Sequence, residues 1–564
     1  MSDEIVDAVV VGSGFGGAVM AYRLAEGGKS VWVLERGKSY PPNSFARAPA
    51  EMAKNFWDPS KGLYGLYNIW SFRKSAAIFA SGVGGGSLVY ANVLIRKPEE
   101  WFFTNLPGGG TEPWPVNRKQ LDPHYDSVEK MMNAQSYPYQ DAPYRDTPKM
   151  LAFQEAAATL GRPWEPVKLA VSFRSKHIDS DSPQNNPPVI GGPIQEHARN
   201  MHNMDRSTCR LCGECDLGCN YGSKNTLDFN YLSEAKRLGA EIKALHEVRS
   251  FAPDPPHGFK VEYVVHDTAR TPGSSGELKV HTVRCRKLVL AAGSLGSTYL
   301  LLKNRHNFPA VSPALGKRYS TNGDSIGFLV RATKGTPPQP RILSPYFGAA
   351  ITGGIRVSDL PKIGIYIEEW GNPYLVSWLV EATGIVGYLR RFVYFAWLSL
   401  KYQLGLANDP SLNGKLADLI GDAVTSSTSM PFIAMGLEVP AGTMSIQDRH
   451  LDIEWTEAPS KFHYDRVTGE LKRIAEVLGG KYTESPTIKW NFNQFVTAHP
   501  LGGCGMGVDK ANGVVDTHGQ VFDYPGLFVA DGAVMPGPVG VNPALTIAAL
   551  AERFATRLVE DWKR

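Results

Sequence analysis

The sequence predicts an α/β fold in two domains, and three observations support that prediction. Residues 5–11 form an apolar, β-branched run that turns through closely spaced glycines into a helical run, which is typical of a buried parallel strand followed by a crossover helix. Residues 287–297 repeat this order, with small residues at the turn. From 320 to 490 the pattern changes to alternating strands and long loops. A parallel-sheet domain joined to a second, sheet-based domain accounts for these patterns.

Composition and charge place the chain among globular proteins of ordinary make-up. Its 564 residues are 43% hydrophobic and 20% charged, with a net charge of +4, and this length leaves room for two domains. Because both signs of charge are mixed, we expect no nucleic-acid partner. The chain enters its first strand at once, without the charged leader of a signal peptide, and we therefore expect a cytoplasmic location.

The glycines after the first strand have the spacing of a dinucleotide-binding turn. The run from Gly12 to Gly17 has the pattern G-x-G-x-x-G, and the next strand, 31–34, ends at Glu35. Such glycines allow the backbone to approach a pyrophosphate at the N-terminus of the following helix, and the acidic residue accepts a ribose hydroxyl. Because the motif lies between a strand and a helix, it predicts dinucleotide binding.

Two further segments are suited to a flat ring or a phosphate. Four glycines fall within five positions at 82–86, and their small size allows the backbone to pack against a cofactor; a flexible turn is the alternative. Near the C-terminus, the strand in 526–532 ends in an acidic turn at Asp531 and Gly532. That turn suits a phosphate or ribityl contact, and an ordinary strand end is the alternative.

A histidine and an asparagine near the C-terminus form the candidate catalytic pair. His499 lies on a loop, and Asn542 stands directly before Pro543 and an apolar-periodic run. Asparagine followed by proline predicts the N-cap of a helix, where the helix dipole stabilises negative charge. Histidine exchanges protons near neutral pH, and an amide orients an oxygen atom. Taken alone, His499 is better interpreted as a hydrogen-bonded loop histidine, and the catalytic interpretation depends on the motifs around it.

Four of the six cysteines are crowded together with the spacing C-x2-C-x2-C-x3-C. They are Cys209, Cys212, Cys215 and Cys219. Bacterial ferredoxins use this run for iron–sulfur clusters, although with a proline where this chain has Asn220. Zinc usually takes two separated pairs and fits less well. Two interpretations stay open: reduced thiols that pack a loop, which we favour, and iron–sulfur ligands.

Together these motifs resemble the glucose–methanol–choline (GMC) flavoprotein oxidoreductases, and among them the cholesterol oxidases with non-covalent flavin. The matching runs lie in the family's order from residue 5 to residue 552. The resemblance implies a Rossmann-like FAD-binding domain, with Glu35 at the adenosine ribose and Val248 near the adenine. It implies that the following residues bind the FAD: Gly12, Gly14, Phe15, Gly17, Glu35, Gly82, Gly85, Gly86, Ser87, Asn92, Val248, Ala292, Gly293, Asp531, Gly532, Asn542 and Pro543.

The same resemblance implies oxidation of an alcohol CH–OH group by hydride transfer to flavin N5, with His499 and Asn542 at the substrate hydroxyl. An apolar insert at 374–406 favours a hydrophobic alcohol, most of all a 3-hydroxysteroid, over a sugar. O2 or another compound would accept the electrons. Two alternatives remain: a long-chain alcohol dehydrogenase with an acceptor other than oxygen, and a non-catalytic flavin-binding electron carrier or sensor.

Cholesterol oxidases also use a carboxylate of the substrate domain to isomerise the steroid double bond. The corresponding region of this chain is interrupted by the insert, and its candidates are Glu381, Glu368 and Glu369. The sequence does not choose among them and leaves an isomerase activity unassigned.

The insert also bears on membranes and on the division into domains. Its aromatic residues with nearby Arg and Lys are typical of a helix lying in a membrane interface, and its longest uncharged run, nine residues, is too short to span a bilayer; an internal lid or a dimer contact is the alternative. The motifs predict a discontinuous FAD-binding domain at 1–45, 75–115, 205–320 and 495–564. They predict a substrate-binding domain at 46–74, 116–204 and 321–494.

Overall fold

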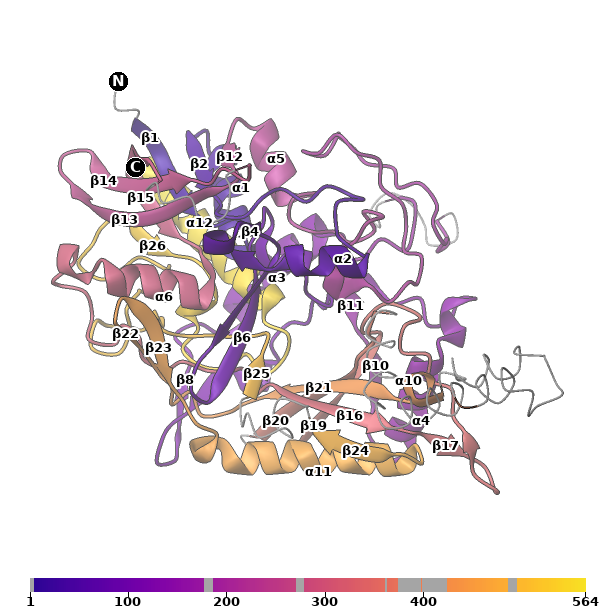
Figure 1. The fold of residues 1–564 in the computed structure, drawn as a ribbon. Coiled ribbons are helices and arrows are strands. Elements are labelled where there is room, and N and C mark those ends of the chain that lie inside the picture. Colours follow the sequence, from indigo (N-terminus) through magenta and orange to yellow (C-terminus); the bar gives the residue numbers. More distant parts are fainter. Residues whose placement is uncertain are drawn as a thin grey trace.

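The computed structural model describes most of the chain and shows two large sheets (Figure 1). The described residues are 5–176, 186–269, 278–360, 363–373, 397, 424–484 and 495–563. Except for Trp397, the insert at 374–406 lies outside them, and so does Glu381. One sheet lies at the end of the molecule that carries both chain termini, and the other lies at the opposite end.

The first sheet is the predicted parallel sheet. Among the described residues it has seven strands in the order β12-β2-β1-β15-β14-β13, with β26 also paired to β15. Strands β12, β2, β1, β15 and β26 run parallel, whereas β13 and β14 form an antiparallel extension. The strands are β1 (Ile5–Val11), β2 (Val31–Leu34), β12 (Glu241–Lys243), β13 (His246–Asp254), β14 (Gly258–Val265), β15 (Val280–Leu290) and β26 (Leu527–Val529).

Helices from distant parts of the chain pack together beside this sheet. Helix α1 (Phe15–Glu26) packs against α12 (Ala544–Lys563) and α5 (Tyr231–Arg237), and α3 (Arg118–Met131) packs against α12. The approach of α1 is very close, because a Cβ on Gly16 would lie 1.4 Å from the carbonyl oxygen of Ala530. The N-terminal turn of α1 is thereby fixed against the end of β26.

The second sheet is antiparallel and confirms the predicted sheet-based second domain. Its order is β10-β19-β20-β21-β16-β24, and α11 (Lys461–Val477) covers its lower face in Figure 1. Apolar side chains of α11 and α4 (Pro148–Thr159) share a buried core with the sheet. The strands are β10 (Trp164–Pro166), β16 (Ser325–Val330), β19 (Gly353–Leu360), β20 (Ile363–Glu369), β21 (Met430–Gly436) and β24 (Lys481–Glu484).

Smaller elements connect the two sheets. A three-stranded sheet of β25 (Phe495–Thr497), β6 (Ser75–Ala80) and β5 (Tyr67–Ser71) lies between them in Figure 1, and α6 (Gly293–Lys303) follows β15. The remaining described strands and short helices are β3 (Trp57–Asp58), β4 (Leu63–Tyr64), β7 (Phe103–Asn105), β8 (Thr111–Pro113), β9 (Gln135–Ser136), β11 (Lys168–Leu169), β17 (Thr333–Lys334), β18 (Gln339–Pro340), β22 (Thr443–Gln447), β23 (His450–Glu454), α2 (Pro49–Met52) and α10 (Val424–Ser427).

The predicted domain boundaries remain predictions. Segment 116–204 supplies β10 to the second sheet, yet the same segment also supplies α3, which packs against α12 of the first domain. Over the part of the chain that the structure describes, no helix combines the length and the apolar character that crossing a bilayer requires.

A buried carboxylate joins the three helices α1, α5 and α12. Glu552 accepts hydrogen bonds from Arg23 Nε at 2.6 Å and from the Tyr231 hydroxyl at 2.7 Å, and its side chain is 1% exposed. Removing one partner of such a group leaves the other partners unpaired away from water.

We therefore expect Glu552→Ala to lower the free energy of unfolding by about 2–4 kcal/mol, measured by urea denaturation of the FAD-saturated protein. The control is Glu560→Ala, which removes an exposed carboxylate from the same helix and should change that free energy by less than about 0.5 kcal/mol. Equal losses in the two variants would show that the buried contacts do not matter.

Candidate active site

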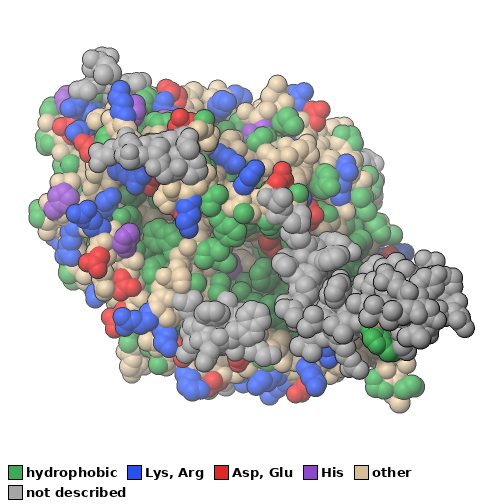
Figure 2. All heavy atoms as spheres, in the orientation of Figure 1, with side chains coloured by type: hydrophobic (Ala, Val, Ile, Leu, Met, Phe, Trp, Pro, Cys, Tyr) green, Lys and Arg blue, Asp and Glu red, His purple; other side chains and the backbone are tan. Residues whose placement is uncertain are grey.

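One large cavity of about 1030 Å³ joins the predicted nucleotide motif to the predicted catalytic pair. Its walls come from the first sheet, from the β5–β6 hairpin and from the second sheet. Figure 2 shows a hollow in the face of the molecule that is turned toward the viewer, and the visible walls of this hollow are mostly hydrophobic. The residues that sequence analysis collected from both ends of the chain therefore face the same space.

Most of the predicted cofactor-binding residues line this cavity. They are Gly12, Gly14, Phe15, Glu35, Gly85, Gly86, Val248, Ala292, Gly293, Asp531, Gly532, Asn542 and Pro543. The two glycine loops touch, because a Cβ on Gly85 would lie 2.6 Å from the Cα of Gly14. Gly12 has a φ of +98°, and a Cβ there would lie 2.4 Å from the carbonyl oxygen of Ala291. Only glycine fits at this close contact, called here the glycine crossing. The backbone can therefore approach a bound phosphate there.

Four other predicted cofactor-binding residues do not line the cavity but support its walls. Gly17 packs the first helix onto its strand, since a Cβ there would lie 2.1 Å from the carbonyl oxygen of Gly12. The Gly82 carbonyl accepts a hydrogen bond from the Ser13 hydroxyl at 3.4 Å. The Ser87 hydroxyl donates to the Gly84 carbonyl at 2.7 Å. Asn92 is fully buried with a φ of +71°.

Two buried carboxylates order the loops at the nucleotide end. Glu35 accepts from the Gly37 amide at 2.9 Å and from the Ser13 amide and hydroxyl at 3.1 and 2.8 Å, and burial raises its pKa. Asp531 accepts from the amides of Gly293 and Ala533 at 2.9 and 2.8 Å, and burial raises its pKa to about 6. Asp531 therefore binds the start of α6 to the end of β26.

His499 is held by a carboxylate that the sequence analysis did not identify. Its Nδ1 lies 2.8 Å from Oδ1 of Asp324, and the histidine side chain is 15% exposed. We assign the proton to Nδ1, because a carboxylate accepts a hydrogen bond from it. The other ring nitrogen, Nε2, is then an acceptor, and His499 lines the cavity. No local signal links these residues, which are 175 positions apart.

Asn542 is buried beside a second carboxyl group. Its Nδ2 donates to Oε2 of Glu368 at 3.2 Å, and its Oδ1 has no hydrogen-bond partner among the described residues. The prediction that Asn542 caps the following helix is therefore wrong: α12 begins at Ala544, and the Pro543 carbonyl accepts the hydrogen bond from the Ile547 amide. Proline, which has no amide hydrogen to donate, fits this position. Asn542 itself lines the cavity, and its Oδ1 is a buried acceptor.

Two of the three carboxylates considered for isomerisation, Glu368 and Glu369, lie in the described part of the chain and have different surroundings. Glu369 forms a fully buried ion pair with Lys149 at 3.0 Å and accepts from the Thr352 amide at 2.9 Å. Glu368 is also fully buried, and burial raises its pKa well above the usual value, which favours the protonated form. Of the two, Glu368 is the one with a hydrogen bond to a member of the predicted catalytic pair, Asn542.

The four crowded cysteines surround a separate small cavity of about 20 Å³. All six cysteines are free, and neither Cys285 nor Cys504 lines this cavity. The Leu211 amide donates to Cys209 Sγ at 3.4 Å, and burial raises the pKa of Cys212 to about 12. In the described part of the chain, no three His, Cys, Asp or Glu side chains are grouped so as to hold a metal ion. The structure thus gives the iron–sulfur interpretation no support.

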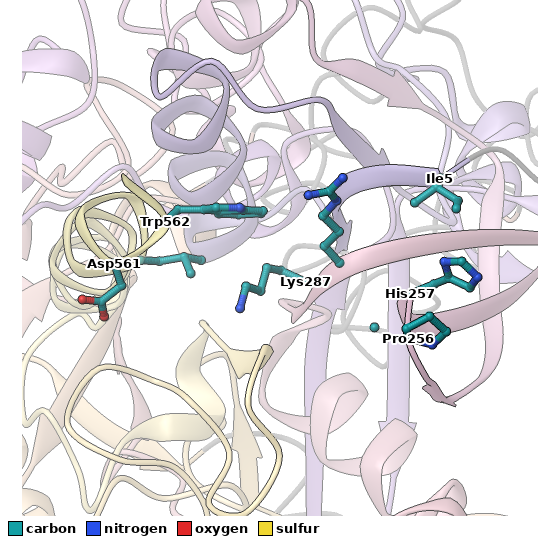
Figure 3. Close-up of a pocket in the computed structure, with 9 residues that line it drawn as sticks. Ile5, Pro256, His257, Lys287, Asp561 and Trp562 are labelled. Carbon is teal, nitrogen blue, oxygen red and sulfur yellow. The ribbon is translucent and has the colours of Figure 1, made fainter. Parts of the chain in front are cut away.

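A second pocket, of about 480 Å³, lies at the far end of the first sheet (Figure 3). Its walls include Lys287 and Arg286 of β15 and Trp562 of α12. The cavity holding His499 and Asn542 shares none of these lining residues, so this pocket is distinct from the candidate active site.

Comparisons with known proteins agree with the motifs. The chain is 31% identical over 570 residues to the cholesterol oxidase of Mycobacterium tuberculosis, covering 98% of this chain and 90% of that protein. It is 28% identical to a cholesterol oxidase of Acinetobacter baumannii, with 97% and 93% covered. It is 25% identical to a long-chain-alcohol oxidase of Arabidopsis thaliana, with 98% and 67% covered.

The fold and the family are also recognised. Pyridoxine 4-oxidase from Mesorbium loti superimposes over 98% of each chain with a TM-score of 0.55 and 16% identity, a likeness of fold. The GMC oxidoreductase family matches residues 6–318 and 457–551, with its N-terminal and C-terminal domains in order. Because the N-terminal match alone covers more than half of the chain, the protein belongs to the GMC oxidoreductase family.

Proposed function

We propose that this protein is an FAD-dependent oxidoreductase that oxidises the CH–OH group of a hydrophobic alcohol, with a 3-hydroxysteroid as the preferred class. The observation that carries this proposal is the cavity, because the glycine crossing, His499 and Asn542 all line it. The relatives named as cholesterol oxidases support the sterol, and the relative named as a long-chain-alcohol oxidase keeps the alternative open.

The residues at the nucleotide end fit FAD. Gly14, Phe15 and Gly16 at the start of α1 line the cavity, and a helix N-terminus stabilises phosphate. Asn542, whose buried Oδ1 has no partner among the described residues, lines the same cavity. When bound there, FAD supplies the hydride acceptor.

His499 is the proposed acceptor of the hydroxyl proton. Its hydrogen bond to Asp324 fixes the ring and leaves Nε2 unprotonated, as a general base requires. Asn542, which also lines the cavity, is proposed to orient the substrate oxygen through its side-chain amide. The proposed division of labour is therefore that His499 moves the proton and Asn542 fixes the position of the oxygen.

The cavity walls near the second sheet favour an apolar substrate. Ile326, Phe328 and Ile433 of the second sheet line the cavity, and Trp70 and Phe72 of the β5–β6 hairpin also line it. Burial of a sterol ring system against such walls is favourable by about 25 cal/mol per Å² of apolar surface, whereas the extra hydroxyls of a sugar would lose hydrogen bonds to water.

The proposal also extends to isomerisation, to the electron acceptor and to the location of the protein. Isomerisation, if the protein performs it, would use Glu368, which contacts Asn542. For the electron acceptor, the relatives named as oxidases favour O2 over another compound. A cytoplasmic location and a peripheral membrane contact through 374–406 stay proposals from the sequence.

Replacing His499 with Ala should leave yellow, bound FAD but slow its reduction by substrate about 10²–10⁴-fold, because the hydroxyl proton then has no acceptor. The measurement is stopped-flow absorbance without oxygen. His306→Ala, which removes an exposed histidine that does not line the cavity, is the control and should reduce at the normal rate. Unimpaired reduction in His499→Ala would remove the assignment.

Anaerobic mixing with a sterol and, separately, with a long-chain alcohol tests the substrate class. We expect the sterol to bleach the flavin band faster, because its rigid rings bury more apolar surface without loss of chain entropy. Oxygen is then admitted. Rapid return of the yellow colour supports an oxidase, slow return supports a dehydrogenase, and bleaching by neither alcohol would favour the carrier or sensor.

Iron and acid-labile sulfide should be measured on protein purified without air. From the cysteine spacing the alternative proposal is an iron–sulfur cluster that takes electrons from the flavin, whereas four free thiols are expected from the structure. Stoichiometric iron and sulfide would establish the cluster. Their absence, together with thiols that react once the protein is denatured, would end that proposal.

A further inference from the structure

One short buried segment contacts the loops of both proposed catalytic residues. Residues 320–324, called here the support segment, precede β16, and the side chains of Ser320, Thr321, Asn322 and Asp324 are at most 2% exposed. No motif marks this segment in the sequence, and its importance emerges only from its contacts in the folded chain.

Asp324 binds the histidine loop through both carboxylate oxygens. Its Oδ1 accepts from His499 Nδ1 at 2.8 Å, and its Oδ2 accepts from the Thr497 hydroxyl at 2.8 Å and the Ala498 amide at 3.1 Å. Beyond the histidine, Ser320 and Leu501 exchange backbone hydrogen bonds of 3.0 and 2.9 Å. The support segment therefore fixes the histidine loop on both sides of His499.

Asn322 binds the loop that leads to Asn542. Its Oδ1 accepts from the Gly540 amide at 2.9 Å, and its Nδ2 donates to the Val541 carbonyl at 3.0 Å. The φ of Asn322 is +60°, a conformation that asparagine tolerates better than most residues. The side chain thus makes the hydrogen bonds that a neighbouring strand would otherwise make to Gly540 and Val541, the two residues directly before Asn542.

The support segment is itself fixed by Glu438 at the end of β21. This buried carboxylate accepts from the Ser320 hydroxyl at 2.7 Å and from the Thr321 amide and hydroxyl at 2.5 and 2.9 Å. Its other oxygen accepts from the Tyr464 hydroxyl of α11 at 2.8 Å. The segment is therefore held by the second sheet and its covering helix, while both catalytic loops belong to the C-terminal part of the chain.

We infer that the support segment fixes His499 relative to Asn542, with Asp324 and Asn322 as positioning residues that act through the two catalytic side chains. This inference rests on the proposed function of that pair. Asp324 selects the tautomer of His499 and holds its ring, and Asn322 holds the backbone before Asn542. A displacement of about 1 Å in such a pair lowers a reaction rate up to about 100-fold.

Two variants test the inference on the FAD-bound protein. Asp324→Asn keeps the shape and removes the charge that accepts the Nδ1 proton. Asn322→Gly removes both hydrogen bonds and retains a residue that tolerates positive φ. We expect each to lower the limiting rate of anaerobic flavin reduction about 10–100-fold, with the dissociation constant of the sterol changed by less than about threefold.

The matched control is Asn304→Gly. Like Asn322, Asn304 is buried, accepts from one backbone amide (Phe251, 3.3 Å) and donates to one backbone carbonyl (Leu300, 2.8 Å). It does not line the cavity. This variant should lose a similar amount of stability without slowing flavin reduction. If Asn322→Gly does not retain FAD, Asn322→Ser takes its place with the same expected result.

Double mutants separate positioning from general disruption. In a His499→Ala background, Asp324→Asn should slow reduction by less than about twofold more, and Asn322→Gly should behave likewise in an Asn542→Ala background. Undiminished losses in these backgrounds, or an equal loss in Asn304→Gly, would overturn the inference. If His499→Ala itself reduces normally, the proposed function fails instead, so the two failures are distinguishable.

Discussion

The parallel pairing of β15 with β26 is the constraint on which the rest of the site depends. Leu288 and Leu290 pair with Leu527 and Val529, and the Ala530 amide donates to the Leu290 carbonyl at 2.9 Å. This pairing brings the C-terminal part of the chain against the sheet that carries the nucleotide motif. His499 and Asn542 lie on either side of β26 in the sequence, so the same pairing places both beside the glycine crossing, because the carboxyl ends of parallel strands share one edge.

The proposed chemistry also depends on how the buried carboxyl groups between the two sheets are neutralised or hydrogen-bonded. Glu369 is neutralised by Lys149 in a fully buried pair, whereas burial raises the pKa of neighbouring Glu368 and favours its neutral form. Asp324 faces His499. Each carboxyl group is thus ion-paired, hydrogen-bonded or neutral, as low-dielectric surroundings require. The cavity wall can therefore include His499 and Asn542 beside apolar side chains such as Ile433.

The sequence predicted what is encoded locally. The glycine turn, Glu35 and the strands around them follow from short-range spacing, and the structure places them as expected. The N-cap prediction for Asn542 failed because α12 begins two residues later, at Ala544, and the Asn542 Oδ1 accepts no amide of its first turn. Asp324 and Asn322 could not be predicted, since their partners are 175 and about 220 positions away. Contacts at such separations leave no periodicity or spacing in one sequence.

The central claim is that a C–H bond of a hydrophobic alcohol breaks as its hydride leaves for the flavin. The most direct measurement is anaerobic flavin reduction by a 3-hydroxysteroid with deuterium in place of the hydrogen on the hydroxyl-bearing carbon. We predict slower reduction by the deuterated sterol, a primary isotope effect on the limiting rate, since transfer of this hydrogen is then part of the measured step. Flavin reduction that does not involve this hydrogen, shown by deuterium quantitatively retained in the product, would contradict the account.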